Sequence, residues 1–250
     1  MEKASPTRLL YYEDAYLREF EAKVFLITKN NGLASIILDN TAFYPTGGGQ
    51  PSDRGMIKGE KGKAEIVDVQ SENGRVLHLT NKIVGEIEKD EIIKGTIDWN
   101  RRYSLMKNHT AAHIIAEAIR RVLKRPIEIV GSGLDADKAR LDLALQNSLR
   151  PMFPEIEASA NSIVKEDRSV EIRSMNREEA EKYVEKFHES LKTLPLNVSH
   201  VRIVEVKGVH ACACGGTHVK STGELGSVEI LGRSSKGKGV ERLEFRTESP

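Results

Sequence analysis

Residues 101–124 read RRYSLMKNHTAAHIIAEAIRRVLK, and this stretch decides the architecture of the second part of the chain. Its apolar residues recur with a period near 3.6, which predicts a helix from Arg102 to Lys124. The residues that share one arc of this helix are Ala111, Ile115, Ala118, Ile119 and Val122. Pro126 lacks a backbone N–H and blocks any continuation of the helix.

Beyond this helix the pattern alternates between strands and helices. Residues 130–145 favour a turn followed by a strand, and SVEIRSM at 169–175 favours another strand. Asn176 with Glu179 three residues later is typical of a helix start, here of a helix over residues 177–191. The segment 201–246 alternates strands and Gly-rich turns. Together these patterns predict an α+β domain over residues 96–250.

Before the helix the sequence favours short strands separated by turns. AKVFLITKN (22–30) and LASIILDN (33–40) flank Asn-Asn-Gly, a combination that favours a hairpin because these residues tolerate positive φ. Three further strands are expected within 63–70, 75–81 and 91–99. Only Ala15–Ala22 has a possible helical period. We expect residues 1–95 to form a small β-barrel or a strongly bent sheet, with the domain boundary at about 90–100.

Composition limits the classes of protein to which the chain can belong. It has 250 residues, 39% hydrophobic and 30% charged, and its 38 basic residues nearly balance 37 acidic ones. No apolar run reaches the ~18 residues of a membrane span, and the first residues do not resemble a secretory signal. We therefore expect a cytoplasmic globular protein, with neither a membrane nor DNA as partner. The sequence leaves the oligomeric state open.

Two pairs of residues have the spacing of metal ligands. His109 and His113 lie four apart on one face of the expected helix, and Cys214 and His218 lie four apart across Gly-Gly-Thr. Nitrogen and sulfur ligands suit zinc, so the four residues predict one zinc site. Cys212 and His210 are spare candidates outside this spacing. Thr110 stands where the Glu of an HExxH metalloprotease would be, which disfavours peptide hydrolysis by that mechanism.

Three separated motifs carry a resemblance to a known family. NHTAAH (108–113) and CGGTHV (214–219) resemble the zinc-site motifs of the alanyl-tRNA synthetase editing domain. FYPTGGGQPSDRG (43–55) resembles the glycine-rich motif of the free-standing AlaX proteins. The resemblance runs from about Leu10 to Phe245. The length and two-part layout are similar to the medium, AlaX-M type.

The resemblance implies hydrolysis of the ester of misacylated tRNA(Ala), chiefly Ser-tRNA(Ala) and sometimes Gly-tRNA(Ala). It implies Zn²⁺ as cofactor, held by His109, His113, Cys214 and His218. Cys212 departs from the family motif, which leaves open whether a second thiolate competes for the ion. Thr110 and Thr217 are candidates to orient water or substrate, or hydroxyls that satisfy nearby backbone.

Candidate substrate and tRNA contacts lie in both parts of the chain. Gly47, Gly48, Gly49 and Gln50 are candidates to close over the substrate, with a plain Gly-rich hairpin as the alternative. Asp53 and Arg54 are candidates to pair locally. Basic residues around the expected helix and in a late Gly-rich segment are candidates to contact tRNA phosphates, or plain solvated surface: Arg101, Arg102, Arg120, Arg121, Lys124, Arg125, Lys236 and Lys238.

Two other functions remain open from the sequence. A non-catalytic RNA-binding module would use the zinc as a structural ion. Peptidyl-tRNA hydrolysis is suggested by Gly48-Gly49-Gln50, a tripeptide also found in peptide release factors, but it would leave the metal motifs unexplained.

Overall fold

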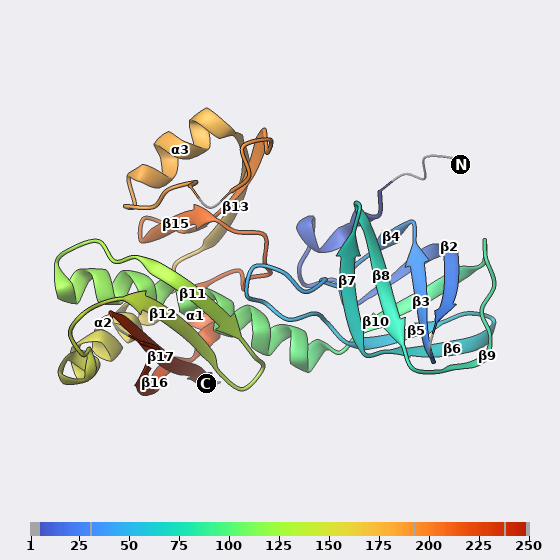
Figure 1. Cartoon of the computed structure of the whole chain (residues 1–250), viewed down its shortest axis with the longest axis horizontal. Coiled ribbons are helices and arrows are strands. Elements are labelled where there is room, and N and C mark those ends of the chain that lie inside the picture. Colours follow the sequence, from blue (N-terminus) through green and yellow to red (C-terminus); the bar gives the residue numbers. More distant parts are fainter. Residues whose placement is uncertain (1–5, 31, 193, 238, 249–250) are drawn as a thin grey trace. The chain divides into compact units, whose positions relative to one another are not determined.

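A computed structural model describes residues 6–30, 32–192, 194–237 and 239–248 (Figure 1). The chain forms two compact units, Met1–Tyr103 and Ser104–Pro250. Helix α1 (Trp99–Leu123) begins in the first unit and continues in the second. Within the described ranges, no helix is both long enough and apolar enough to cross a membrane.

The first unit is almost entirely β-structure. Its elements are β1 (Arg8–Leu9), the 3₁₀ helix η1 (Leu10–Tyr12), β2 (Glu19–Asn30), β3 (Leu33–Leu38), β4 (Asn40–Thr41), β5 (Gly55–Lys58), β6 (Lys61–Ile66), β7 (Asp68–Glu72), β8 (Arg75–Thr80), β9 (Ile83–Glu86) and β10 (Ile92–Ile97). Eight strands form one antiparallel sheet in the order β7-β8-β3-β2-β10-β5-β6-β9, and β1 pairs with β4 in parallel.

This sheet curves around one core but stays open at its edges. The core draws residues from strands near both ends of the order, for example Val69 of β7 and Ala64 of β6, which requires the sheet to bend. No ladder joins β7 to β9 among the described residues, so the expected closed barrel is wrong and the bent sheet is what forms. The two edge strands carry mostly exposed residues, which leaves little apolar surface to drive closure.

The expected hairpin is confirmed, and the possible helix is not. Strands β2 and β3 pair antiparallel with Asn30 opposite Leu33, and Gly32 has a φ of 81°. Asn31 lies outside the described residues. The stretch 15–22 contains no helix, because its second half belongs to β2 and pairs with β10. There Phe20 lies opposite Gly95, whose missing side chain leaves room for the aromatic ring.

In its described residues, the second unit contains two sheets, two further α-helices and two short 3₁₀ helices. Its elements after α1 are β11 (Ile129–Leu134), β12 (Ala139–Ala144), η2 (Arg150–Met152), α2 (Phe153–Lys165), β13 (Val170–Asn176), α3 (Arg177–Glu185), β14 (His200–Val206), β15 (His210–Ala213), η3 (Thr222–Leu225), β16 (Ser227–Ser235) and β17 (Val240–Glu248). One sheet has the order β11-β12-β17-β16 and the other β13-β14-β15, all antiparallel. Helices together with these sheets confirm the mixed helix-and-sheet composition expected for this part.

Of the two later α-helices of this unit, the sequence predicts α3 but not α2. The Asn176 side chain accepts a hydrogen bond from the Glu179 N–H at 2.9 Å, which confirms the expected start of α3. Helix α2 was missed, although its buried residues Ile156, Ala160, Ile163 and Val164 have helical spacing. The side chain of Asn161 ties α2 to β16 by donating to the Val228 carbonyl at 2.8 Å.

Candidate metal centre

Helix α1 supplies two histidines from one face. His109 and His113 are 8% and 7% exposed, and their ring centroids lie 5.4 Å apart. Asn108 holds this part of the helix against the four-stranded sheet, because its side-chain oxygen accepts hydrogen bonds from both the backbone N–H and the hydroxyl of Thr247 on β17. The histidine pair therefore lies on a buried helical segment that is hydrogen-bonded to β17.

The turn after β15 supplies the other two side chains. The backbone N–H of Cys214 donates to the Arg202 carbonyl, and Arg202 Nη1 donates to the Cys214 carbonyl at 2.6 Å. These bonds fix the position of the cysteine at the end of the three-stranded sheet. His218 follows four residues later and is 3% exposed.

The four side chains converge on one point. The potential ligand atoms of His109, His113, Cys214 and His218 all lie within 4.8 Å of one another. Cys214 Sγ is 3.4 Å from His109 Nε2 and 3.3 Å from His218 Nε2. Residues more than 100 positions apart in the chain thus form a cluster that could bind a metal ion.

Burial keeps these groups in their neutral forms. Burial and, to a smaller extent, the nearby positive charge of Arg202 together lower the pKa of His109 to about 3. Burial also lowers the pKa values of His113 and His218 well below the usual range. A neutral imidazole has the lone pair that a metal ion needs. Burial raises the pKa of the Cys214 thiol, so binding of a metal there would release its proton.

The Thr110 hydroxyl is engaged inside the protein. It donates to the Met106 carbonyl at 3.0 Å, lies 3.1 Å from His218 Nδ1, and accepts from the Val219 N–H at 3.3 Å. With the proton of His218 on Nδ1, this contact leaves Nε2 free to face Cys214. This arrangement favours a positioning role for Thr110 over direct contact with water or substrate. Thr217 is also completely buried.

Substitution of Thr110 by valine tests this role. The variant keeps the shape of the side chain but removes the hydroxyl that orients His218, so we expect metal affinity to fall roughly 10–100-fold. Competition with a coloured chelator measures the affinity. The Thr110→Ser variant retains the hydroxyl and should bind metal nearly as well as the wild type. Unchanged metal affinity in Thr110→Val would contradict the proposed positioning role of the hydroxyl.

Arg202 is a residue that the sequence pattern did not single out. It lies on β14, and its charge lowers the pKa values of all three histidines of the cluster. The local sequence does not indicate a functional role for Arg202, because the neighbouring residues follow an ordinary strand pattern. Only the pairing of β14 with β15 brings Arg202 to the cluster.

The glycine-rich motif belongs to the first unit, where it forms a tight turn. Gly47 and Gln50 exchange backbone hydrogen bonds of 3.0 and 2.9 Å. Gly48 and Gly49 between them have φ values of 57° and 84°, a conformation that favours glycine. Both are exposed, Gly47 is half-buried, and the Gln50 side chain is buried.

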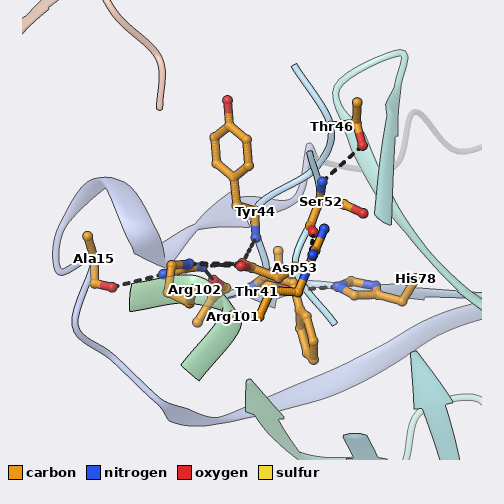
Figure 2. A network of polar contacts seen from close by, with 11 residues as sticks. Ala15, Thr41, Tyr44, Thr46, Ser52, Asp53, His78, Arg101 and Arg102 are labelled. Atoms are coloured by element: carbon orange, nitrogen blue, oxygen red, sulfur yellow. Dashed lines mark hydrogen bonds and ion pairs between the residues drawn. The ribbon is translucent and has the colours of Figure 1, made fainter. Parts of the chain in front are cut away.

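Arg102 lies inside the first unit, where it binds protein groups (Figure 2). Its side chain is completely buried and forms an ion pair with Asp53. It also donates to the carbonyls of Ala15 and Ala42 at 2.8 and 2.6 Å. Asp53 accepts a further hydrogen bond from the Tyr44 N–H. The expected phosphate contact of Arg102 is therefore wrong, because its side chain is completely buried and its N–H groups donate to protein oxygens.

The pairing expected for Asp53 is corrected by the same contacts. Asp53 is completely buried beside Arg102, whereas the side chain of Arg54 is exposed. Arg101 is half-buried and donates from Nε to the Ser52 carbonyl at 3.2 Å. The glycine-rich segment is thus joined to the start of α1 by two consecutive arginines.

The other basic candidates differ in whether a carboxylate pairs with them and in how exposed they are. Arg120 and Arg121 both bind Glu117, at 2.6 and 2.7 Å, which neutralises part of their positive charge. Lys124, Arg125 and Lys236 are exposed. Lys238 lies outside the described residues.

Comparison with known proteins finds family matches in both parts of the chain. Residues 4–101 match the family described as tRNA synthetases class II (A), and residues 201–244 match the threonyl and alanyl tRNA synthetase second additional domain. The chain is 38% identical to alanyl-tRNA editing protein AlaX-M of Methanosarcina acetivorans, over 96% of this chain and 98% of that protein. It is 39% identical to the AlaX-M protein of Methanosarcina mazei, over 96% of each. It is also 38% identical to alanine–tRNA ligase of Saccharolobus islandicus, of which it covers 26%.

Proposed function

The chain belongs to the AlaX-M family of alanyl-tRNA editing proteins, and we propose that it hydrolyses the ester bond of tRNA(Ala) charged with the wrong amino acid. The proposed main substrate is Ser-tRNA(Ala), with Gly-tRNA(Ala) as a second one. The observation that carries this proposal is the convergence of His109, His113, Cys214 and His218.

The donor set of this cluster fits zinc as the cofactor. Ligand atoms around a tetrahedral zinc ion are roughly 3.3–3.6 Å apart, given bond lengths of about 2.0–2.3 Å. The separations of Cys214 Sγ from His109 Nε2 and His218 Nε2, 3.4 and 3.3 Å, support this choice. When bound, zinc is a Lewis acid that can activate water and polarise an ester carbonyl.

The residues around the cluster supply the rest of the proposed chemistry. Thr110 orients His218 through the 3.1 Å contact with Nδ1. Arg202 places a positive charge beside the cluster, where negative charge develops on the ester oxygen. Separately, in the first unit, the exposed Gly48-Gly49 turn remains a proposed substrate contact, because glycine allows close approach to its backbone.

Discrimination against alanine requires a polar contact. Alanine is smaller than serine, so no steric filter that admits serine excludes it. A buried group that hydrogen-bonds the seryl hydroxyl is left unpaired by alanine, which can reject the cognate amino acid by about 10⁴-fold. Hydrolysis of Gly-tRNA(Ala) would additionally require exclusion of the alanyl methyl group.

The test is incubation of the protein with Ser-, Gly- and Ala-charged tRNA(Ala), with and without a chelator. We expect rapid hydrolysis of Ser-tRNA(Ala), little hydrolysis of Ala-tRNA(Ala), and loss of activity on chelation that added zinc reverses. Rapid hydrolysis of Ala-tRNA(Ala), or full activity of the metal-free protein, would contradict the proposal.

A structural zinc in a non-catalytic RNA-binding protein is the second candidate function. It is favoured by the presence of four potential protein ligands, which can close the coordination sphere. This alternative predicts that chelation unfolds the second unit without any prior deacylase activity. Circular dichroism during chelation, recorded beside the deacylation assay, separates the two functions.

The proposed contact with tRNA phosphates predicts a dependence on salt. Replacing exposed Lys124 or Lys236 with glutamine should weaken tRNA binding and reduce the slope of log affinity against log salt by roughly 0.7–0.9. Filter binding over a salt series measures this slope. Lys182→Gln is the matched control, because Lys182 is exposed but paired with Glu178 on α3. If the control and the two variants change the slope equally, these lysines make no specific phosphate contacts.

A further inference from the structure

A second cluster of potential metal ligands lies beside the first. His210 and Cys212 are two apart on β15, so their side chains lie on the same face of the strand. Their potential ligand atoms and that of His113 all lie within 4.8 Å of one another. Cys212 Sγ is 3.8 Å from His113 Nδ1, and the ring centroids of His113 and His210 are 5.1 Å apart.

One nitrogen of this cluster is buried without a hydrogen-bond partner. His210 is 5% exposed, and its Nδ1 finds no partner among the described residues. Its other nitrogen, Nε2, lies 3.2 Å from Glu189 Oε1. A carboxylate accepts hydrogen bonds, so Glu189 favours the tautomer with the proton on Nε2 and a lone pair on Nδ1. An unsatisfied buried nitrogen costs free energy, which binding of a cation would recover.

We propose that His210, Cys212 and His113 form a second site, for a thiophilic transition metal ion such as Zn²⁺. Two nitrogens and one sulfur are donors that such an ion prefers, and three protein ligands leave one position for water. The Glu189 carboxylate orients His210 through its contact with Nε2.

Binding at this site releases protons in a defined way. The Cys212 thiol loses its proton to the solvent when its sulfur binds the ion. His113 is shared with the four-residue cluster, so filling both sites at once would require both of its ring nitrogens as donors and the loss of its remaining N–H proton to the solvent.

A small hollow in the second unit is lined in part by His210 of this cluster. Its lining includes His210 and Glu189 together with Glu117, Arg120 and His188. Glu189 is one-third exposed, so its carboxylate also attracts cations from solution toward His210. Glu117 adds a second carboxylate to the lining, although it is already bound by Arg120 and Arg121.

Zinc stoichiometry in the full-length protein tests the proposal. The protein is stripped of metal, reloaded with Zn²⁺ alone and weighed by native mass spectrometry. We expect the wild type to bind two zinc ions and the Cys212→Ser and His210→Gln variants to bind one. His200→Gln is the matched control, because His200 is an exposed histidine on β14, and it should bind two.

Several results would overturn the second site. If the wild type binds only one zinc ion, the second site does not exist. This holds even if the Cys212 and His210 variants lose that ion, because the loss would then mean that Cys212 competes for a single ion. Two ions in all variants would also overturn the site. Deacylation is not part of this readout, so failure of the proposed function and failure of the second site are distinguishable.

Substitution of Glu189 tests the second site without changing any of its ligands, so it remains informative if the Cys212 or His210 variants fail to fold. Glu189→Ala leaves all three ligands in place, and we expect the affinity of the second zinc ion to fall roughly 10–100-fold because His210 is no longer oriented. Glu189→Gln keeps a hydrogen-bond acceptor and should restore most of the affinity. Unchanged affinity in Glu189→Ala would contradict the proposed role of this carboxylate and, with it, the site.

Discussion

Replacement of His109 by alanine should reduce hydrolysis of Ser-tRNA(Ala) by more than about 100-fold, the upper end of the loss typical for a group that only orients a metal ligand. His109 Nε2 lies 3.4 Å from Cys214 Sγ, so the variant would lose one of the four proposed ligands and leave a gap in the buried cluster. Single-turnover deacylation and zinc content, measured on the same sample, give the result.

The controls for this variant separate chemistry from folding. His200→Ala removes an exposed histidine and should leave both deacylation and zinc content unchanged. The first unit contains the single tryptophan, Trp99, which stacks on Tyr103 and reports its folding by fluorescence. We expect that signal to persist in His109→Ala. Full activity with a full zinc content would show that His109 is not a ligand.

Replacement of Arg102 by methionine should destabilise the first unit by about 3–5 kcal/mol, because it leaves the Asp53 carboxylate buried without its ion-pair partner. The variant also removes the donors to the carbonyls of Ala15 and Ala42. Urea unfolding followed by Trp99 fluorescence measures the loss of free energy.

Two further variants make this prediction specific. Arg54→Met removes an exposed arginine and should change the free energy of unfolding by less than about 0.5 kcal/mol. Combining Arg102→Met with Asp53→Asn removes the unpaired charge, so the double variant should be more stable than the sum of the single effects predicts, by roughly 0.5–3 kcal/mol. If Arg102→Met is as stable as the wild type but binds tRNA more weakly, the buried pair has been misinterpreted.

Local patterns in the sequence were sufficient for many of the secondary-structure elements. The helix expected from Arg102 to Lys124 is confirmed as α1, and the capping residue Asn176 and the β2–β3 hairpin are confirmed as well. These features depend on hydrogen bonds and side-chain periodicity within a few residues, which the sequence displays directly. Helix α2 had the same kind of signal and could have been predicted from the spacing of Ile156, Ala160 and Ile163.

The sequence by itself also determined which residue types could bind a metal, through two four-residue spacings and their donor chemistry. Only the tertiary structure decided which side chains meet. It buried Arg102 against Asp53, 49 positions away, and placed Arg202 and Cys212 beside the histidines of α1. It also left the sheet of the first unit open where a barrel was expected. The physical reason is that burial, ion pairing and strand closure depend on groups distant in the chain, whose positions no local periodicity encodes.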